Sequence, residues 1–425
     1  MVRKRPCVRF TLWAPLTKLK MRIPKTIKIS RCRLCFNKNL SKIYSFGNLF
    51  ISNFVLKKNI NKGIKAPLTL VYCKKCKLVQ LEHSAPQEIM YKKFYWYRSS
   101  VKNTMKSALK DIFLTVKKMS ILNKGDTILD IGANDGTLLK YFKKEKYITI
   151  GCEPAKNLTK FLKRNCKYIL TNFWNSKDLE KILKRKKIRK PKLITAIGMF
   201  YDLEDPSKFI ADAAKVLDFN GVFIAQLMCL ESMLKKNDLG NICHEHLEFY
   251  SYDSLKYLFE KNGLKIFKIE KNEINGGSYR IFCKKNISQS ISYKDKTSLS
   301  KIKKFIQHVE LNKKKCLTFL TNAVKKGLKV FIYGASTKGN TLLQYYGINH
   351  KLIKFAAERS PEKWGKYTIG SGVKIISENK ARKLNPDYFF VMPYSFIKEF
   401  MKREKKWLKR GGKFILPYPN FKIIK

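Results

Sequence analysis

The sequence predicts an α/β protein with a doubly wound parallel sheet, a small N-terminal metal-binding domain and a second, smaller C-terminal α/β domain that is Rossmann-like. Three observations lead to this fold class. Two Cys-x-x-Cys pairs lie before residue 77, and two later stretches, 126–285 and 329–418, each alternate strand-like with helix-like runs. Such alternation is typical of βαβ units, in which the strands lie parallel.

Length and composition limit the class of protein further. A chain of 425 residues accommodates two to three domains. We divide it into a basic extension (1–20), a cysteine-rich domain (21–100), a central domain (101–300) and a C-terminal domain with a helical connector (301–425). The extension is either a transit peptide or a segment before a true start at Met21. Hydrophobic residues make up 44% of the chain, which excludes disorder over most of it.

The net charge of +59 arises from 90 Lys and Arg residues against 31 Asp and Glu residues. Nucleic-acid-binding proteins share such a balance. Here most of the basic residues are Lys, and they are spread along the chain while Asn and Ile are also abundant. This pattern favours a coding bias over a nucleic-acid partner. The sequence leaves the oligomeric state open.

The strongest metal signal is the pairing of Cys32 and Cys35 with Cys73 and Cys76. Four thiolates form the tetrahedral set that a structural zinc ion prefers, and they leave no open position for catalysis. Four unrelated cysteines are the alternative. The remaining cysteines are scattered, and no convincing signal peptide or apolar run of membrane-spanning length occurs. We therefore expect reduced thiols and a cytoplasmic protein.

The elements of the two alternating stretches can be assigned in order. Ser251 is the expected N-cap of one helix and Gly263 its C-terminal stop. In the central domain we expect strands at 127–132, 147–154, 192–200, 221–229, 264–272 and 277–285, with helices at 102–123, 137–145, 206–217 and 251–262. A charged helix at 302–326 connects to strands at 329–334, 352–358, 388–395 and 413–418, with helices at 340–347 and 395–411.

An acidic glycine loop follows the first strand of the central domain. Glycines allow a tight turn and a close approach to a ligand. A carboxylate at the end of the next strand can accept both hydroxyls of a ribose. This combination is the pattern of S-adenosylmethionine (SAM) binding, and an ordinary strand–turn–helix is the alternative. The candidate cofactor residues are Asp130, Gly132, Asn134, Asp135, Gly136, Glu153 and Pro154.

Three further motifs are candidates for chemistry. Cys243-His244-Glu245-His246 follows the fourth strand, and a neutral histidine there can accept a proton near pH 7. Its spacing argues against a second metal, and helix-capping histidines are the alternative. The segments 275–280 (NGGSYR) and 334–340 (GASTKGN) offer backbone N–H groups and cationic side chains to an anion. Plain turns are the alternative for both.

As an ordered set, these motifs resemble the sugar-nucleotide C-methyltransferases. The matching segments run from Cys32 to about Pro393 and include CRLC, CKKCKLVQL, FYWYRSS, LDIGANDGTLL, GCEPAKN, HEHLEFYS, INGGSYR and YGASTKGN. The resemblance implies a zinc-binding domain, a class I methyltransferase domain and a C-terminal Rossmann-like domain. Cys243 stands where a tyrosine is usual, and Tyr201 stands where a histidine is common. The chain therefore resembles a sister branch of the deoxysugar C-3-methyltransferases.

The resemblance also implies a reaction. The substrate would be a nucleoside-diphosphate 4-keto-deoxysugar, which loses a proton beside the ketone before the enolate carbon attacks the methyl group of SAM. His246 would be the base, oriented by Glu245, with His244 the next candidate, and Tyr97 would close over the sugar. The implied substrate contacts are Tyr95, Ser99, Asn275, Gly276, Ser278, Arg280, Ser336 and Lys338.

Two other functions remain open at this point. A SAM-dependent methyltransferase of RNA or another acceptor would share the fold and cofactor, but it leaves the HEH and NGGSYR motifs without an evident role. A non-catalytic binding protein with the same fold is the second alternative. The intact cofactor acids and the HEH motif argue against it.

Overall fold

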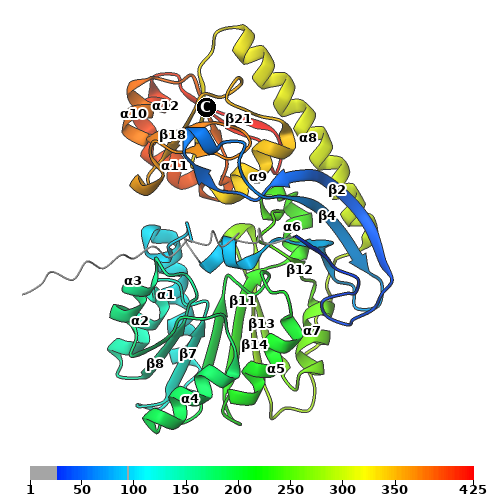
Figure 1. Ribbon diagram of the computed structural model, residues 1–425, viewed down its shortest axis with the longest axis vertical. Coiled ribbons are helices and arrows are strands. Elements are labelled where there is room, and N and C mark those ends of the chain that lie inside the picture. Colours follow the sequence, from blue (N-terminus) through cyan, green and yellow to red (C-terminus); the bar gives the residue numbers. More distant parts are fainter. Residues whose placement is uncertain (1–25, 93–94) are drawn as a thin grey trace, which may run out of the picture.

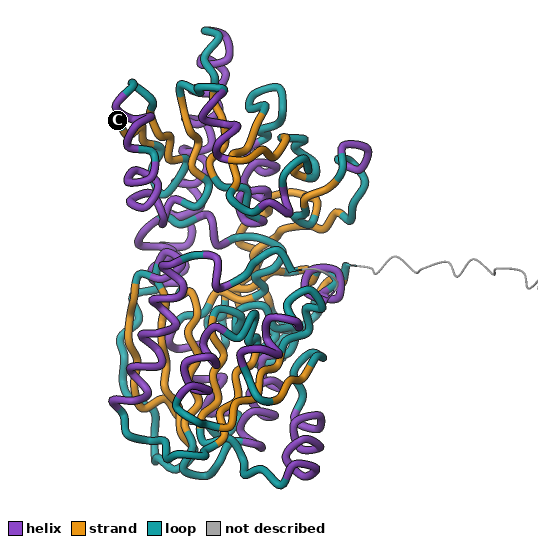
Figure 2. The backbone as a smooth tube through the Cα atoms, turned by 90° about the vertical axis from the view of Figure 1, so that its left-hand side faces the viewer, coloured by secondary structure: helices purple, strands orange, loops and turns teal. Residues whose placement is uncertain are grey.

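The computed structural model describes residues 26–92 and 95–425 (Figure 1). The predicted basic extension lies outside the described residues. Two α/β units stand one above the other (Figures 1 and 2). A long hairpin lies beside the boundary between them (Figure 1). Among the described residues, no helix combines the length and the apolar character needed to cross a bilayer.

The central unit is a seven-stranded sheet with the order β13-β14-β11-β10-β7-β8-β9. The strands β9, β8, β7, β10 and β11 run parallel, as predicted. The strands β13 and β14 are antiparallel, because a short turn joins them and only antiparallel neighbours can be joined so tightly. The strands are β7 (Thr127–Ile131), β8 (Ile148–Cys152), β9 (Tyr168–Leu170), β10 (Leu193–Ile197), β11 (Val222–Met228), β13 (Lys265–Asn272) and β14 (Ser278–Lys284).

Helices cover this sheet. Ser251 caps its helix in a capping box with Ser254, and Gly263 has a φ of 77° just past the helix end, so both predicted boundaries are confirmed. Short elements at β9 and at two helices, α3 and α4, had no predicted counterpart. The helices are α1 (Asn103–Lys118), α2 (Thr137–Lys144), α3 (Thr159–Asn165), α4 (Ser176–Lys186), α5 (Pro206–Val216), α6 (Leu230–Lys236) and α7 (Tyr252–Lys261).

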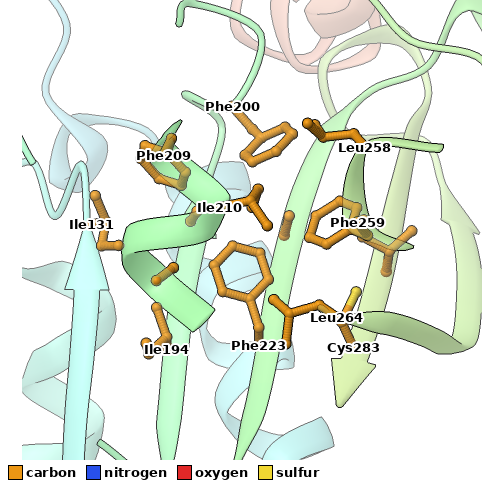
Figure 3. Close-up of a cluster of buried hydrophobic side chains, with 14 of the residues drawn as sticks. Ile131, Ile194, Phe200, Phe209, Ile210, Phe223, Leu258, Phe259, Leu264 and Cys283 are labelled. Atoms are coloured by element: carbon orange, nitrogen blue, oxygen red, sulfur yellow. The ribbon is translucent and has the colours of Figure 1, made fainter. Parts of the chain in front are cut away.

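The core of the central unit is aromatic where α5 and α7 meet the sheet (Figure 3). Phe200 stacks on Phe259 with ring centroids 5.7 Å apart, and Phe209 meets Phe200 edge to face. These rings are buried. The burial of these rings holds β10 in place. The loop that leads to the candidate site begins at the carboxyl end of this strand.

The N-terminal region forms a four-stranded antiparallel sheet with the order β12-β5-β4-β2. Its long hairpin, β2 with β4, runs from the central unit to the C-terminal unit (Figure 1). Two short strands cross the predicted domain boundaries: β12 comes from the central region, and β3 joins the C-terminal sheet. The strands are β1 (Ile27–Lys28), β2 (Leu40–Phe50), β3 (Phe54–Val55), β4 (Lys65–Cys73), β5 (Val79–Leu81), β6 (His83–Ser84) and β12 (Glu248–Phe249).

The C-terminal unit is an eight-stranded sheet with the order β21-β20-β19-β15-β16-β18-β17-β3. Its strands are β15 (Val330–Tyr333), β16 (Phe355–Glu358), β17 (Tyr367–Thr368), β18 (Lys374–Ser377), β19 (Tyr388–Val391), β20 (Lys413–Leu416) and β21 (Lys422–Ile424). Its helices are the connector α8 (Leu299–Lys325), α9 (Thr337–Tyr346), α10 (Glu378–Lys383), α11 (Ile397–Arg403) and α12 (Lys405–Lys409).

Two element predictions in this unit are wrong. The expected helix at 395–411 is broken at Glu404, whose buried carboxylate accepts hydrogen bonds from Arg382 and Tyr333. The expected strand at 388–395 ends at Val391, because Pro393 has no N–H for a sheet ladder.

Candidate active site and metal centre

The four predicted metal ligands come together at one end of the β2–β4 sheet. The Sγ atoms of Cys32 and Cys76 are 3.5 Å apart, and those of Cys35 and Cys73 are 3.4 Å apart. All four sulfur atoms lie within 4.8 Å of one another, and none forms a disulfide. Sulfur atoms about 2.3 Å from a common tetrahedral centre would have nearly this spacing, so the set fits a zinc ion.

Each cysteine pair is shaped by the residue that follows it. Phe36 and Lys77, one position after each second cysteine, have φ values of 57° and 59°. The two pairs thus turn in the same way, although 37 residues separate them in the chain. Gln80 Nε2 donates to the Sγ of Cys32 at 3.2 Å, which stabilises negative charge on that sulfur.

The acidic glycine loop is strongly curved. Gly132, Asn134 and Gly136 all have positive φ, at 73°, 52° and 77°. A Cβ at Gly132 would lie 2.6 Å from Met199, so the glycine is required by space as well as by conformation. Glu153 closes the loop from the next strand, because its Oε2 accepts from the backbone N of Asn134 at 2.9 Å.

This loop faces a cavity, which we call the cofactor cavity, at the carboxyl ends of the parallel strands. Burial raises the pKa of Asp130 to about 7, although the Thr195 hydroxyl, 2.6 Å away, opposes this. Burial also raises the pKa of Glu153. Lining residues include Asp130, Gly132, Asn134, Glu153 and Pro154 of the prediction, together with Leu138, Phe173, Trp174, Asp202 and Asp212.

Two residues predicted to bind the cofactor have another task. Asn134 accepts from the backbone N of Ser99 at 2.9 Å and donates to the carbonyl of Tyr97 at 3.2 Å. Asp135 accepts from the backbone N of Ser100 at 2.9 Å. Asp135 and Gly136 do not line the cofactor cavity. The loop therefore fixes the aromatic segment 95–100, a link that neither motif alone indicated.

A second cavity, which we call the acceptor cavity, opens between the central and C-terminal units. Its lining residues include Lys102, Tyr201, Asp238, Asn241, Glu245, His246, Asn275, Ser278, Ser336, Lys338 and Tyr394. It meets the cofactor cavity at a junction that both cavities share, formed by Tyr95, Tyr97, Ser99, Leu109, Ile197, Gly198 and Asp202. A donor in one cavity and an acceptor in the other can therefore meet at these side chains.

His246 lies in the acceptor cavity, and one of its two ring nitrogens already forms a hydrogen bond within the protein. Its Nδ1 is 2.6 Å from the carbonyl of Asn241, so Nδ1 carries the proton and Nε2 is left as an acceptor. Its ring packs edge to face on Tyr201, with centroids 4.5 Å apart. Burial, together with the charge of Lys338, lowers the pKa of His246 well below its usual value, so the imidazole is neutral at pH 7.

The other residues of the CHEH motif diverge. The Glu245 carboxylate accepts from the Thr337 hydroxyl at 3.0 Å, and that hydroxyl is the one hydrogen-bond partner of the carboxylate among the described residues. His244 turns away from the cavities: its Nε2 lies 2.9 Å from the carbonyl of Ala66 in β4, and burial lowers its pKa to about 4. The structure thus removes His244 from the site. Cys243, Glu245 and His246 have ligand atoms within 4.8 Å of one another, but the charge of Lys338 opposes a cation there.

The two anion motifs meet at the acceptor cavity from opposite sides. Lys338 lies in the first turn of α9, and its Nζ donates to the side-chain amide oxygen Oδ1 of Asn241 at 3.3 Å. Ser336 caps the same helix. Asn275 and Ser278 approach from the β13–β14 turn. A Cβ at Gly276 would meet Asp238, so this glycine serves close packing and does not line the cavity.

Arg280 is placed differently from the prediction. It lies within the sheet at 3% exposure, where its Nε donates to Gln226 at 2.8 Å and its Nη2 to Asp111 at 2.8 Å. It lines neither cavity. The alternation of side chains along β14 accounts for this, because Ser278 and Arg280 lie on one face but only Ser278 is at the cavity end.

Sequence reasoning missed Asp202, Asn241 and Lys102, which all line the acceptor cavity. Asp202 lies in the loop after β10, and an acid in a loop at the carboxyl end of a parallel strand was the available signal. No local pattern marks Asn241, which reaches the site through the fold of the loop after α6.

Three protein families match successive parts of the chain. The family described as "Putative zinc binding domain" matches residues 32–91, "Methyltransferase domain" matches 97–269, and "C-methyltransferase C-terminal domain" matches 273–419. A curated relative, "C-methyltransferase NovU" of Streptomyces niveus, is 25% identical over 410 residues, which span 93% of this chain and 97% of that protein. The chain is a SAM-dependent C-methyltransferase. SAM and zinc are the cofactors of this domain set.

Solved methyltransferase structures are similar to part of this C-methyltransferase. Magnesium protoporphyrin IX methyltransferase (ChlM) from Synechocystis PCC 6803, with bound SAM, covers 42% of this chain and 78% of its own, at 11% identity and a TM-score of 0.32. The glycopeptide N-methyltransferase MtfA, complexed with SAM, covers 45% of this chain and 96% of its own, at 9% identity and a TM-score of 0.32.

Proposed function

We propose that this C-methyltransferase transfers a methyl group from SAM to the carbon beside the ketone of a nucleoside-diphosphate 4-keto-deoxysugar, in the cytoplasm. The observation that carries the proposal is the junction of the two cavities, with a neutral histidine in the acceptor cavity and unpaired acids in the cofactor cavity. The full-length similarity to NovU, itself a C-methyltransferase, supports transfer to carbon.

The cofactor cavity fits SAM by the chemistry of its groups. SAM, when bound, supplies an electrophilic methyl group on a positively charged sulfur. Glu153 would accept the ribose hydroxyls and Asp130 would face the ammonium end, because these carboxylates have no ion pair among the described residues. Trp174 and Phe173 provide apolar surface for the purine.

His246 would act as the base. Its Nδ1–H is held by the Asn241 carbonyl, which directs the Nε2 lone pair away from the backbone. The proton beside the ketone passes to Nε2, and the resulting enolate carbon forms a bond to the methyl carbon while the carbon–sulfur bond breaks. Holding both reactants at the junction replaces a bimolecular encounter with an intramolecular one. Tyr95 and Tyr97 lie at this junction and would exclude water.

The nucleotide end of the substrate would lie toward the C-terminal unit. Lys338 and the N-terminus of α9 supply positive charge, and Ser336, Asn275 and Ser278 supply hydrogen bonds. Tyr394 and Phe396 would cover apolar parts of the nucleoside. Arg280 is left out of this set because its guanidinium is already paired.

A panel of nucleoside-diphosphate 4-keto-deoxysugars, incubated in heavy water with and without SAM and followed by mass spectrometry, tests the proposal. We expect enzyme-dependent deuterium uptake beside the ketone and, with SAM, a product heavier by one methyl group. Deuterium uptake without methylation would contradict the cofactor assignment. If no sugar reacts while SAM still binds, the acceptor is of another class, and salt-dependent methylation of RNA is the alternative to test.

A further inference from the structure

Asp202 lies at the junction and lines both cavities. The residue is 9% exposed, and its Oδ1 is fully buried without a hydrogen-bond partner among the described residues. Buried carboxylates are ordinarily paired with a cation or with several N–H donors, because the charged form is costly to bury alone. An unpartnered acid at the point where donor and acceptor meet therefore calls for a ligand or a proton.

The surroundings of Asp202 favour a proton. Among the described residues, the titratable and charged groups that act on it are those of Glu245, Glu248, Lys338, Tyr91, Tyr95, Tyr201 and Cys243. In this set the carboxyls of Glu245 and Glu248 outnumber the one cation, Lys338. Burial, with these carboxyls, raises the pKa of Asp202 well above its usual range.

We propose that Asp202 is a catalytic residue that holds its proton at neutral pH and donates a hydrogen bond to the ketone oxygen as that oxygen becomes an enolate. This inference rests on the proposed function. The proton beside the ketone moves to Nε2 of His246, the electron pair of its C–H bond becomes a carbon–carbon π bond, and the carbonyl π pair moves to the oxygen. Asp202 keeps its own proton throughout and stabilises the charge on that oxygen.

Two hydroxyl donors near the junction are committed elsewhere. The Tyr201 hydroxyl donates to the carbonyl of Gly198 at 2.8 Å, and the Tyr91 hydroxyl donates to the carbonyl of Glu245 at 2.8 Å. The hydroxyls of Tyr95, Tyr97 and Ser99 also line the junction, and that of Tyr97 is the strongest competitor, because among the described residues it too is buried without a hydrogen-bond partner. A Tyr97→Phe variant therefore serves as the comparison for Asp202.

The test compares Asp202→Asn with Asp202→Leu in the deuterium-uptake and methylation assays. Asparagine keeps an N–H donor, so we expect both rates to stay within about tenfold of wild type. Leucine removes the donor, so we expect both rates to fall about 10²- to 10³-fold with SAM affinity unchanged. We expect the wild-type rate to fall as the pH rises through the pKa of Asp202. This loss of rate at high pH should be absent in Asp202→Asn. Asp253→Asn, an exposed acid paired with Lys77, is the control.

Several outcomes would overturn the inference. Equal losses of activity in Asp202→Asn and Asp202→Leu would indicate that Asp202 acts as an ionised base. Full activity in Asp202→Leu, or a larger loss in Tyr97→Phe, would show that Asp202 is not the donor to the ketone oxygen.

Infrared difference spectra between wild type and Asp202→Asn test the protonation of Asp202 without a substrate. A carboxylic-acid C=O band at pH 7 is expected, and its absence overturns the inference even if methylation is observed. Failure of wild type with every sugar would instead reject the proposed function, and this inference with it.

Discussion

The central and C-terminal units of the chain share one local arrangement. In the central unit, Glu153 accepts from the backbone N of Asn134 at 2.9 Å, and in the C-terminal unit Glu358 accepts from that of Ala335 at 3.0 Å. Each carboxylate ends a strand next to the one that carries the loop, and a helix begins just after each loop. The local arrangement of strand, loop and carboxylate is therefore the same in both units.

The charges around the two carboxylates differ. Glu153 has no ion pair among the described residues, and Asp130 also lacks one. Glu358 lies 3.5 Å from Lys363, whose Nζ also donates to the Ala335 carbonyl at 2.9 Å. Unpaired acids suit a cationic ligand, whereas a neutralised acid does not. This difference supports the proposal that SAM binds to the central unit and that the C-terminal unit contributes to the acceptor cavity.

In the proposed mechanism the chemistry takes place at the boundary between the two units. Loss of His246 should therefore have the largest effect. We expect His246→Gln to lower turnover about 10²- to 10⁴-fold, because the base is lost, while SAM affinity stays the same. Steady-state rates and calorimetric SAM titration measure the two quantities. Full turnover in this variant would move the base elsewhere, and a loss of SAM binding would indicate a structural role.

The matched pair Glu153→Ala and Glu358→Ala tests the comparison directly. Removal of two charge-assisted contacts should weaken SAM binding about 100-fold in the first variant, and the second should bind SAM as wild type does. Isothermal titration gives both constants. A similar loss in both variants, with unchanged melting temperatures, would contradict the assignment of SAM to the central unit alone.

The pH dependence of SAM binding sharpens the role of Asp130. Its pKa of about 7 means that the carboxyl gains charge between about pH 6 and pH 8. The ionised form attracts a cation, so SAM affinity should rise about tenfold over this range and stay nearly flat in Asp130→Asn. Binding measured at several pH values in one ionic strength checks this. An affinity that falls with pH would place Asp130 away from the cationic part of SAM.

The smallest effect is expected at Lys338, on the acceptor side. Lys338→Met should raise KM for the nucleotide sugar several-fold, because one cation near the diphosphate is lost, and leave SAM affinity unchanged. Lys338 also contributes to the low pKa of His246, so the acid limb of the pH profile should shift to higher pH in the variant. Lys354→Met, a surface lysine of the same unit, is the control.

Most of the framework could be predicted from sequence where a local pattern carries the physics. The Cys-x-x-Cys pairs, the Asp130–Gly136 loop and the Ser251 cap each depend on neighbours close in the chain. The break at Glu404 and the position of Arg280 depend on partners more distant in the chain. Asp202 was not singled out because its burial and its place at two cavities come from the tertiary fold.

The most direct test of the account is the position of the transferred methyl group. A reactive nucleotide sugar with ¹³C in its ring, incubated with SAM carrying a ¹³C methyl group, gives a product for ¹³C NMR. We expect direct carbon–carbon coupling between the new methyl carbon and the ring carbon beside the ketone. A methyl group on oxygen or nitrogen, without that coupling, would contradict C-methylation.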